Sequence, residues 1–184
     1  MKHQIPNALT ILRFLMVPAF LFYLFVSLDA NRVLISLILF MIASFTDYLD
    51  GMLARKMNVI SDFGKIMDPL ADKLLVLSAL AGLCWLPPFH FSKAIFFIVL
   101  VRELLITLLR EIFQRRGVIV AADKLGKLKT VMQMLGIIGA FAAWTYFGSP
   151  SVKLIWGFEL WFWLVAVITL ASGLNYTLVL FRRK

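Results

Sequence analysis

Five of the ten acidic side chains in this chain of 184 residues lie between positions 47 and 72, and four of these form two close pairs. Asp47 and Asp50 are three residues apart, whereas Asp68 and Asp72 are four residues apart. At 3.6 residues per turn, each spacing places both carboxylates on one face of a helix. If the segment between the pairs makes the two helices antiparallel neighbours, the four carboxylates surround one small space.

Carboxylates this close repel one another, by about 4 kcal/mol for two charges 4 Å apart at an effective dielectric constant near 20. Either protonation or the binding of divalent cations relieves that repulsion. A ligand set made only of oxygen favours the hard cations Mg²⁺, Mn²⁺ and Ca²⁺ over zinc or copper. Bridging carboxylates can hold two such ions about 3.5–4 Å apart, which is the arrangement that stabilises both oxygens of an in-line phosphoryl displacement.

The residues between the two pairs have properties that suit phosphate binding. Gly51 and Ala54 are small enough to let a ligand approach the helix backbone, and Arg55 offers a planar cation. Ser61 and Gly64 are expected in the connecting loop, where a hydroxyl and an unhindered amide can meet a ligand. Aspartates near helix ends are also common without any catalytic role, so the whole pattern carries more weight than the four carboxylates alone.

The rest of the composition indicates an integral membrane protein. Hydrophobic residues make up 62% of the chain, charged residues only 16%, and the mean hydropathy is +0.92. Soluble domains have about a quarter of their residues charged. Charges, prolines and glycines divide the apolar sequence into six spans near the length that a bilayer requires, at 8–28, 33–54, 69–86, 93–114, 126–147 and 153–180. We predict an all-α membrane protein, with residues 1–184 as a single domain folded into a bundle of six transmembrane helices, in which Pro69 lies in the first turn of the third helix.

The positive charges predict how the bundle is oriented. With both termini on one side, only Arg32, Lys93 and Lys153 of the 19 Lys and Arg fall on the other side, and Arg102 falls within the fourth span. Because basic residues favour the cytoplasmic side, the termini and the aspartate cluster are expected there, in a protein that crosses the membrane several times. The net charge of +9 is then explained by topology and anionic lipids, without a nucleic-acid partner.

The pattern D-x2-D-G-x2-A-R-x8-G-x3-D-x3-D is matched without departure by Asp47, Asp50, Gly51, Ala54, Arg55, Gly64, Asp68 and Asp72. In this respect the chain resembles the CDP-alcohol phosphatidyltransferase family, whose signature this is. The resemblance covers essentially the whole chain, and it implies a six-helix membrane bundle that usually forms a homodimer.

The resemblance also implies the roles of the signature residues. The four aspartates would hold two divalent ions, Mg²⁺ or Mn²⁺, and Asp72 would also take the proton of the acceptor hydroxyl. The implied donor is CDP-diacylglycerol, with the cytidine diphosphate portion near Gly51, Ala54, Arg55 and Ser61 and with Asp47, Asp50 and Asp68 beside it. Thr10 and Arg13, three residues apart near the start of the first span, are expected to close the nucleotide side of the same site.

Two further stretches, "IPNALTILRFLMVP" and "REL...LREIFQRRGVIVAADKLGKLKTVMQM", are similar to one branch of that family, the bacterial phosphatidylglycerophosphate synthases. These transfer the phosphatidyl group to glycerol 3-phosphate. An acceptor that carries a phosphate requires a basic pocket, for which Arg110, Lys127 and Lys129 are the candidates. Lysines and arginines at helix ends also extend toward lipid headgroups and fix topology, so both interpretations of these three residues stay open.

Two other functions are weighed against this one. The same chemistry with serine, inositol phosphate or a second phosphatidylglycerol as acceptor is the nearer alternative. An uncharged or zwitterionic acceptor among these would not need the Lys127 and Lys129 charges. A divalent cation channel or carrier would spread its carboxylates through the depth of the membrane, whereas here they gather at one face.

Polar and small residues inside the apolar spans predict helix contacts. Arg102 and Glu103 are charges within the fourth span, and such charges are usually paired or functional. Since adjacent residues do not face each other on a helix, their partners are expected on other helices. Gly136 and Gly139 allow close packing of the fifth helix, either within one subunit or at a dimer interface.

Overall fold

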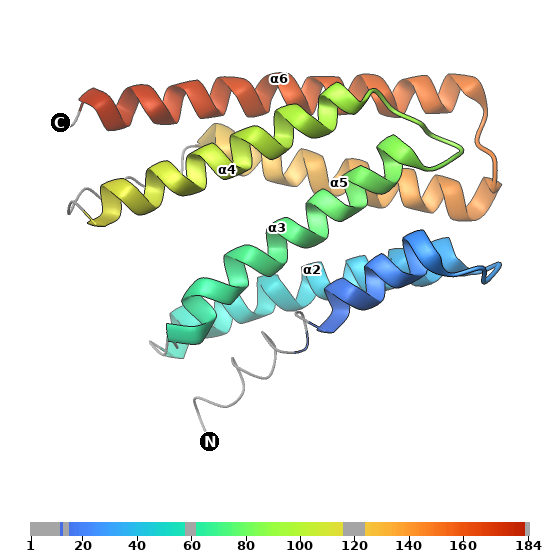
Figure 1. The fold of residues 1–184 in the computed structure, drawn as a ribbon, viewed down its shortest axis with the longest axis horizontal. Coiled ribbons are helices and arrows are strands. Elements are labelled where there is room, and N and C mark those ends of the chain that lie inside the picture. Colours follow the sequence, from blue (N-terminus) through green and yellow to red (C-terminus); the bar gives the residue numbers. More distant parts are fainter. Residues whose placement is uncertain (1–11, 13–14, 58–61, 116–123, 183–184) are drawn as a thin grey trace. The chain divides into compact units, whose positions relative to one another are not determined.

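The computed structural model describes residues 12, 15–57, 62–115 and 124–182, and of residues 47–57, 62–69, 72, 115, 124 and 180–182 within these ranges it describes only the helical backbone. All regular secondary structure in these ranges is helical (Figure 1). The elements are the π-helix η1 (Phe22–Val26) and the α-helices α2 (Arg32–Met57), α3 (Asp62–Trp85), α4 (Lys93–Arg115), α5 (Lys124–Phe147) and α6 (Val152–Arg182). The all-α prediction is therefore confirmed for the described residues.

The helix boundaries follow the breaks in hydropathy closely in the second half of the chain. Helices α4, α5 and α6 agree with the predicted spans to within two residues at each end. By length and apolar composition, Leu125–Phe147 and Val152–Val179 qualify as membrane spans, and Leu15–Val26, Arg32–Thr46 and Lys73–Trp85 are shorter apolar helices. These helices agree with a membrane protein, while the bundle of six spans stays a prediction.

The start of α3 corrects two predictions. The helix begins at Asp62, so Gly64 lies inside it and not in the connecting loop, and Pro69 lies in its interior and not in its first turn. The physical reason is that a helix is held by backbone hydrogen bonds and can extend beyond the apolar run that marks a span. Pro69 lacks an N–H group, so one bond of the helical ladder is absent there.

The chain divides into two compact units, Met1–Gly82 with Phe141–Gly148, and Leu83–Ala140 with Ser149–Lys184. The first unit has an aromatic centre. The ring of Phe20 lies 6.2 Å from that of Phe40 and 6.1 Å from that of Phe141, and all three side chains are buried. Burial of three aromatic rings of this size contributes a large apolar area to packing within the unit.

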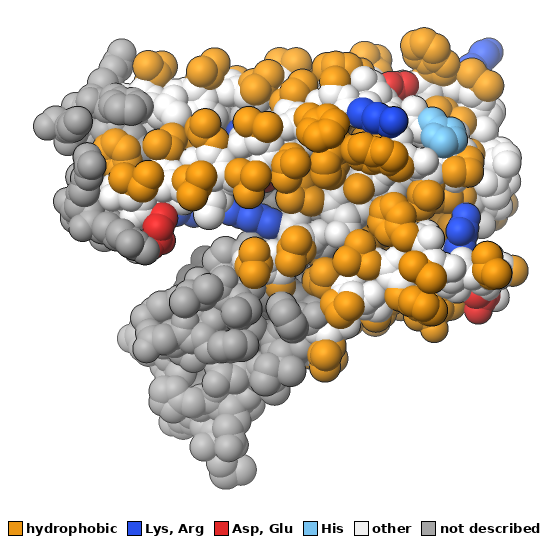
Figure 2. Space-filling view, viewed as in Figure 1, with side chains coloured by type: hydrophobic (Ala, Val, Ile, Leu, Met, Phe, Trp, Pro, Cys, Tyr) orange, Lys and Arg blue, Asp and Glu red, His pale blue; other side chains and the backbone are white. Residues whose placement is uncertain are grey.

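In the second unit α4 and α6 lie side by side (Figure 1). A chain of aromatic rings packs inside it, with centres 5.1 Å apart for Phe89 and Phe91, and 5.6 Å apart for Phe91 and Phe162. The visible surface over these two helices is mostly hydrophobic (Figure 2). Leu104 on α4 and Leu160 on α6 are among the exposed apolar side chains of this unit. An apolar exterior over an apolar interior is what a lipid environment favours.

Small residues let α5 and α6 approach each other within the second unit. A Cβ atom at Gly136 would lie 2.7 Å from Nε1 of Trp161, and one at Gly139 would lie 3.1 Å from the ring of Phe158. The indole N–H of Trp161 donates a 3.0 Å hydrogen bond to the carbonyl of Met132. For both glycines, packing within one subunit is confirmed.

Helix α5 ends at a glycine that suits its position. Gly148 has φ of +63°, in the left-handed region, and its N–H donates to the carbonyl of Trp144 at 2.9 Å. Glycine adopts this conformation without steric cost, which is why it commonly closes a helix. Four residues, 148–151, then separate α5 from α6.

We expect Gly136→Ala to lower the stability of the detergent-solubilised protein by about 1–3 kcal/mol, because the added methyl group overpacks the contact. The indole of Trp161 must then turn away from the Met132 carbonyl. Thermal unfolding measures the change. Gly157→Ala is the matched control, because a Cβ atom at this position meets no described atom within 4 Å. This substitution should leave Tm unchanged or slightly higher. Equal losses in the two variants would contradict the prediction.

Candidate active site

The four aspartates of the signature lie on two helices of the first unit. Asp47 and Asp50 are in α2, and Asp68 and Asp72 are in α3. The helical backbone at each pair supplies the periodicity on which the prediction of shared faces depends. Their side chains lie outside the described part of the structure, so the four-carboxylate cluster stays a prediction.

Of the other residues expected to bind the donor, three lie on described helical backbone and three lie outside the described residues. Gly51, Ala54 and Arg55 belong to the last turns of α2, as a helical approach to a ligand requires. Thr10, Arg13 and Ser61 lie outside the described residues. The structure therefore confirms the helical placement of the first three and leaves every contact to the nucleotide as a prediction.

The three basic residues considered for the acceptor lie in the second unit, in different surroundings. Arg110 on α4 and Lys127 on α5 are exposed, and the guanidinium carbon of Arg110 lies 5.8 Å from the ring centre of Tyr176 on α6. Lys129 is buried, with 5% of its surface exposed. Residues two positions apart on a helix project in nearly opposite directions, about 200° apart around the axis. Lys127 and Lys129 therefore do not share a face.

A cluster of polar side chains joins three helices within this unit, and we call it the Glu103 cluster: Arg102, Glu103, Lys129 and Ser172. Glu103 on α4 accepts hydrogen bonds from the ammonium of Lys129 on α5 and, at 3.0 Å, from Nη1 of Arg102. Nη2 of Arg102 donates to Oγ of Ser172 on α6 at 2.9 Å. The cluster therefore links α4 to both α5 and α6.

The Glu103 cluster confirms one expectation and overturns another. Partners on other helices are confirmed by Lys129 and Ser172. The expectation that Arg102 and Glu103 cannot meet is wrong, because both side chains are long enough to bend toward each other although their Cβ atoms point apart. Sequence reasoning missed Ser172, and its only signal is a hydroxyl inside the apolar sixth span.

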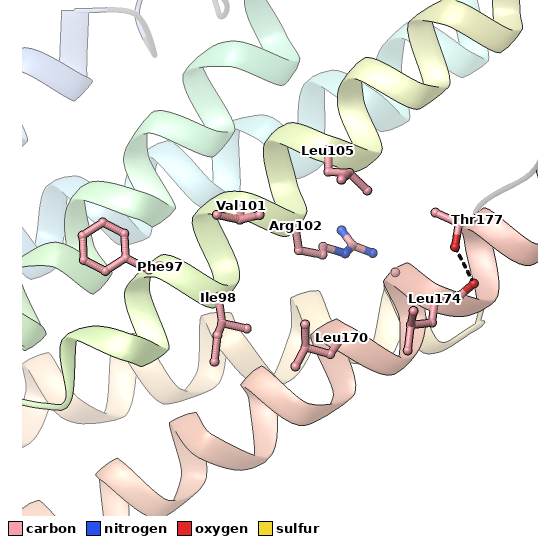
Figure 3. A pocket seen from close by; sticks show the side chains of 9 residues that line it. Phe97, Ile98, Val101, Arg102, Leu105, Leu170, Leu174 and Thr177 are labelled. Carbon is pink, nitrogen blue, oxygen red and sulfur yellow. Dashed lines mark hydrogen bonds between the residues drawn. The ribbon is translucent and has the colours of Figure 1, made fainter.

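Beside Arg102, an open groove of about 420 Å³ runs between α4 and α6. Figure 3 shows the arginine side chain extending from α4 toward α6, where Leu170 and Leu174 lie near its tip. The remaining lining is almost entirely hydrocarbon: Phe97, Ile98, Val101, Leu105, Gly173 and Thr177. Polar groups here therefore have hydrocarbon neighbours, which makes their hydrogen bonds more important.

Comparison with known proteins gives the chain a family. The family model described as CDP-alcohol phosphatidyltransferase matches residues 3–174. The chain belongs to this family. As a member of a family of phosphatidyltransferases it is an enzyme, and the resemblance inferred from the aspartate pattern is confirmed.

Curated relatives of this CDP-alcohol phosphatidyltransferase include proteins named CDP-diacylglycerol–glycerol-3-phosphate 3-phosphatidyltransferase from Bacillus subtilis, Rickettsia typhi and Mycoplasma genitalium. The Bacillus subtilis protein is 36% identical over 94% of this chain and 93% of its own length. The Rickettsia typhi protein is 34% identical over 94% of each. The Mycoplasma genitalium protein is 38% identical over 79% of this chain, which spans 63% of that relative.

CDP-alcohol phosphatidyltransferases generally depend on divalent metal ions. The donor set of the signature fits this requirement, since Asp47, Asp50, Asp68 and Asp72 would offer only carboxylate oxygens from helical positions. Among the side chains that the structure describes, no three of His, Cys, Asp and Glu form a group suited to a metal, and the four aspartates are not among those side chains. They remain the candidates for a metal site.

We expect Lys129→Met to destabilise the protein by about 1–3 kcal/mol, because Glu103 loses a buried cationic partner. Thermal unfolding in detergent measures this loss. The same substitution at Lys127, an exposed lysine of the same helix, should change stability by less than about 0.5 kcal/mol. A Lys129→Met variant as stable as the wild type would show that the contact with Glu103 contributes little.

Proposed function

We propose that this enzyme transfers the phosphatidyl group of CDP-diacylglycerol to glycerol 3-phosphate, giving phosphatidylglycerophosphate and CMP. The observation that carries the proposal is the family match over residues 3–174, together with the Bacillus subtilis and Rickettsia typhi relatives, which are named for this reaction and align over 94% of the chain. The complete aspartate signature, which lies inside the matched range, agrees with the phosphatidyl transfer. The product lies on the route to phosphatidylglycerol, so the enzyme serves phospholipid biosynthesis.

The signature aspartates form the proposed metal site. Asp47, Asp50, Asp68 and Asp72 would hold two divalent ions, Mg²⁺ or Mn²⁺, which neutralise the diphosphate and the charge that develops on the leaving group. The support is the chemistry of the donor set and its placement on helical backbone in α2 and α3. Removal of the metals by a chelator should then abolish turnover.

The chain's own residues account for binding and proton transfer. Gly51 and Ala54 leave space for the cytidine diphosphate portion along α2, and Arg55 and Ser61 bind its polar groups, with Thr10 and Arg13 closing the nucleotide side. Asp72 accepts the proton of the acceptor hydroxyl while the hydroxyl oxygen forms a bond to the lipid-side phosphorus. The bond from that phosphorus to the bridging oxygen breaks, and CMP leaves with the electron pair. Positioning and electrostatic stabilisation supply most of the rate enhancement.

The acceptor phosphate is assigned to Arg110, Lys127 and Lys129. All three lie in the second unit, and Arg110 and Lys127 are exposed. A phosphate carries charge that cations bind strongly. Serine, inositol phosphate or phosphatidylglycerol as acceptor is the alternative within the same family chemistry.

We further propose a homodimer in the bacterial inner membrane, with several membrane crossings and with both termini and the active site on the cytoplasmic side. The support for the orientation is the asymmetric distribution of Lys and Arg along the chain. The homodimer is proposed from the family resemblance alone. In this orientation the lipid tails of the donor stay in the bilayer while its headgroup meets the aspartates at the membrane surface.

Product analysis by mass spectrometry tests the proposal. The purified enzyme receives CDP-diacylglycerol and Mg²⁺, with glycerol 3-phosphate, serine, inositol, inositol phosphate or phosphatidylglycerol added one at a time. We expect CMP and phosphatidylglycerophosphate from glycerol 3-phosphate alone. Product from another alcohol would keep the donor and replace the acceptor. Absence of CMP from folded protein with either Mg²⁺ or Mn²⁺ would refute the proposed reaction.

We expect Asp72→Asn to lower kcat by about 10²–10⁴-fold, the range typical of a lost general base. Metal binding must be measured alongside, since Asp72 is also a proposed ligand. Asp29→Asn is the control, because Asp29 lies in the exposed turn before α2, where it accepts the N–H of Asn31 at 2.7 Å. Near-normal turnover of Asp72→Asn with intact metal binding would remove Asp72 from the role of base.

A further inference from the structure

The Glu103 cluster places one carboxylate between two cations. Glu103 accepts from both Arg102 and Lys129, so the charges of these three side chains sum to one positive charge. Their exposed side-chain fractions are 13% for Arg102, 15% for Glu103 and 6% for Lys129. Keeping two cations this far from water is costly, and a single carboxylate that contacts both offsets that cost while fixing where they lie.

Two buried side-chain donors of the second unit are without an acceptor among the described residues. Nε of Arg102 and Nε2 of Gln133 are buried, and neither atom has a hydrogen-bond partner within the described part of the chain. Gln133 follows Lys129 by one helical turn on α5, so both side chains project from the same face of that helix. Buried donors of this kind normally have an acceptor, and a phosphate group provides several.

Two glycines border the arginine. A Cβ atom at Gly173 on α6 would lie 3.2 Å from Cγ of Arg102, closer than ordinary packing allows, and one at Gly126 on α5 would lie 3.5 Å from Oγ of Ser172. A larger residue at Gly173 would crowd the side chain that Ser172 and Glu103 hold, whereas a Cβ atom at Gly126 makes an ordinary contact. The position of Arg102 is therefore fixed by groups on α4 and α6.

We propose that Glu103 is a positioning residue for the acceptor: it holds Arg102 and Lys129 where, with Gln133, they receive the phosphate of the acceptor. The inference rests on the proposed function and deepens it. It adds Arg102 and Gln133 to the phosphate site and makes the buried Lys129, not the exposed Lys127, the principal lysine. Glu103 acts through its two cationic partners and not by contact with the substrate.

The test begins with steady-state kinetics of wild type and Glu103→Gln against both substrates. We expect the KM for glycerol 3-phosphate to rise about tenfold, because removing one partner of a close charged pair lets the cations move. The kcat and the KM for CDP-diacylglycerol should stay within about twofold, as expected when uniform binding of one substrate is lost. Glu111→Gln, at an exposed glutamate of the same helix, is the control and should leave every constant unchanged.

A second variant separates positioning from a purely structural role. Glu103→Gln combined with Lys129→Gln replaces the ion pair by two neutral amides that can hydrogen-bond to each other, so Tm should recover toward the wild-type value. We expect the KM for glycerol 3-phosphate to stay raised in this double variant. If Glu103→Gln does not fold, the double variant and Glu103→Asp, which keeps the charge but shortens its reach, provide the same comparison of KM with kcat.

The possible outcomes are distinct. Wild-type enzyme that makes no product from glycerol 3-phosphate would refute the proposed function itself. An active wild type with a selective rise in the KM for glycerol 3-phosphate in Glu103→Gln supports the inference. Equal changes for both substrates, a lower KM for glycerol 3-phosphate, or full recovery of activity together with Tm in the double variant would overturn it.

Discussion

A charge surrounded by hydrocarbon must have a partner, and this requirement explains where the polar groups of the chain lie. In the second unit Glu103 contacts the two cations nearest to it. Glu159 of α6 accepts the backbone N–H of Ser92, just before α4, at 2.9 Å. In the first unit the same requirement applies to the signature aspartates, for which metal ions are the proposed partners. The contacts of Lys129 with Glu103 and of Ser92 with Glu159 also connect segments that are distant in the sequence.

The sequence predicts helices well in this chain, because the signal that defines them is strong. Runs of apolar residues interrupted by charges and by Pro or Gly locate α4, α5 and α6 almost to the residue. The start of α3 is less predictable because its first turns are polar, and hydropathy reports on membrane burial and not on backbone hydrogen bonding. Gly64 and Pro69 were misplaced for this reason.

Some parts of the candidate site can be predicted from the sequence and others cannot. The aspartate pattern locates the proposed metal site and the family, since eight fixed positions constrain the chemistry strongly. Contacts between helices are another matter, because a sequence states which residues are polar but not which of them meet. Arg102 donates a hydrogen bond to Ser172, and Trp161 donates one to the carbonyl of Met132. Which partners these donors meet depends on how the helices pack. A lysine two residues along from another can likewise be buried or exposed, as Lys129 and Lys127 show.

The short connection between α5 and α6 bears on how the protein enters the membrane during synthesis. Their candidate spans have mean hydropathies of 1.3 and 1.9, so α6 is the more strongly apolar of the two. Only residues 148–151 separate the helices, and Gly136 already fits against Trp161. If both helices cross the bilayer as proposed, they can leave the translocon together as a hairpin, in which the more hydrophobic α6 assists the insertion of α5. Insertion of this region would then draw on the glycine contacts as well as on the hydropathy of each helix.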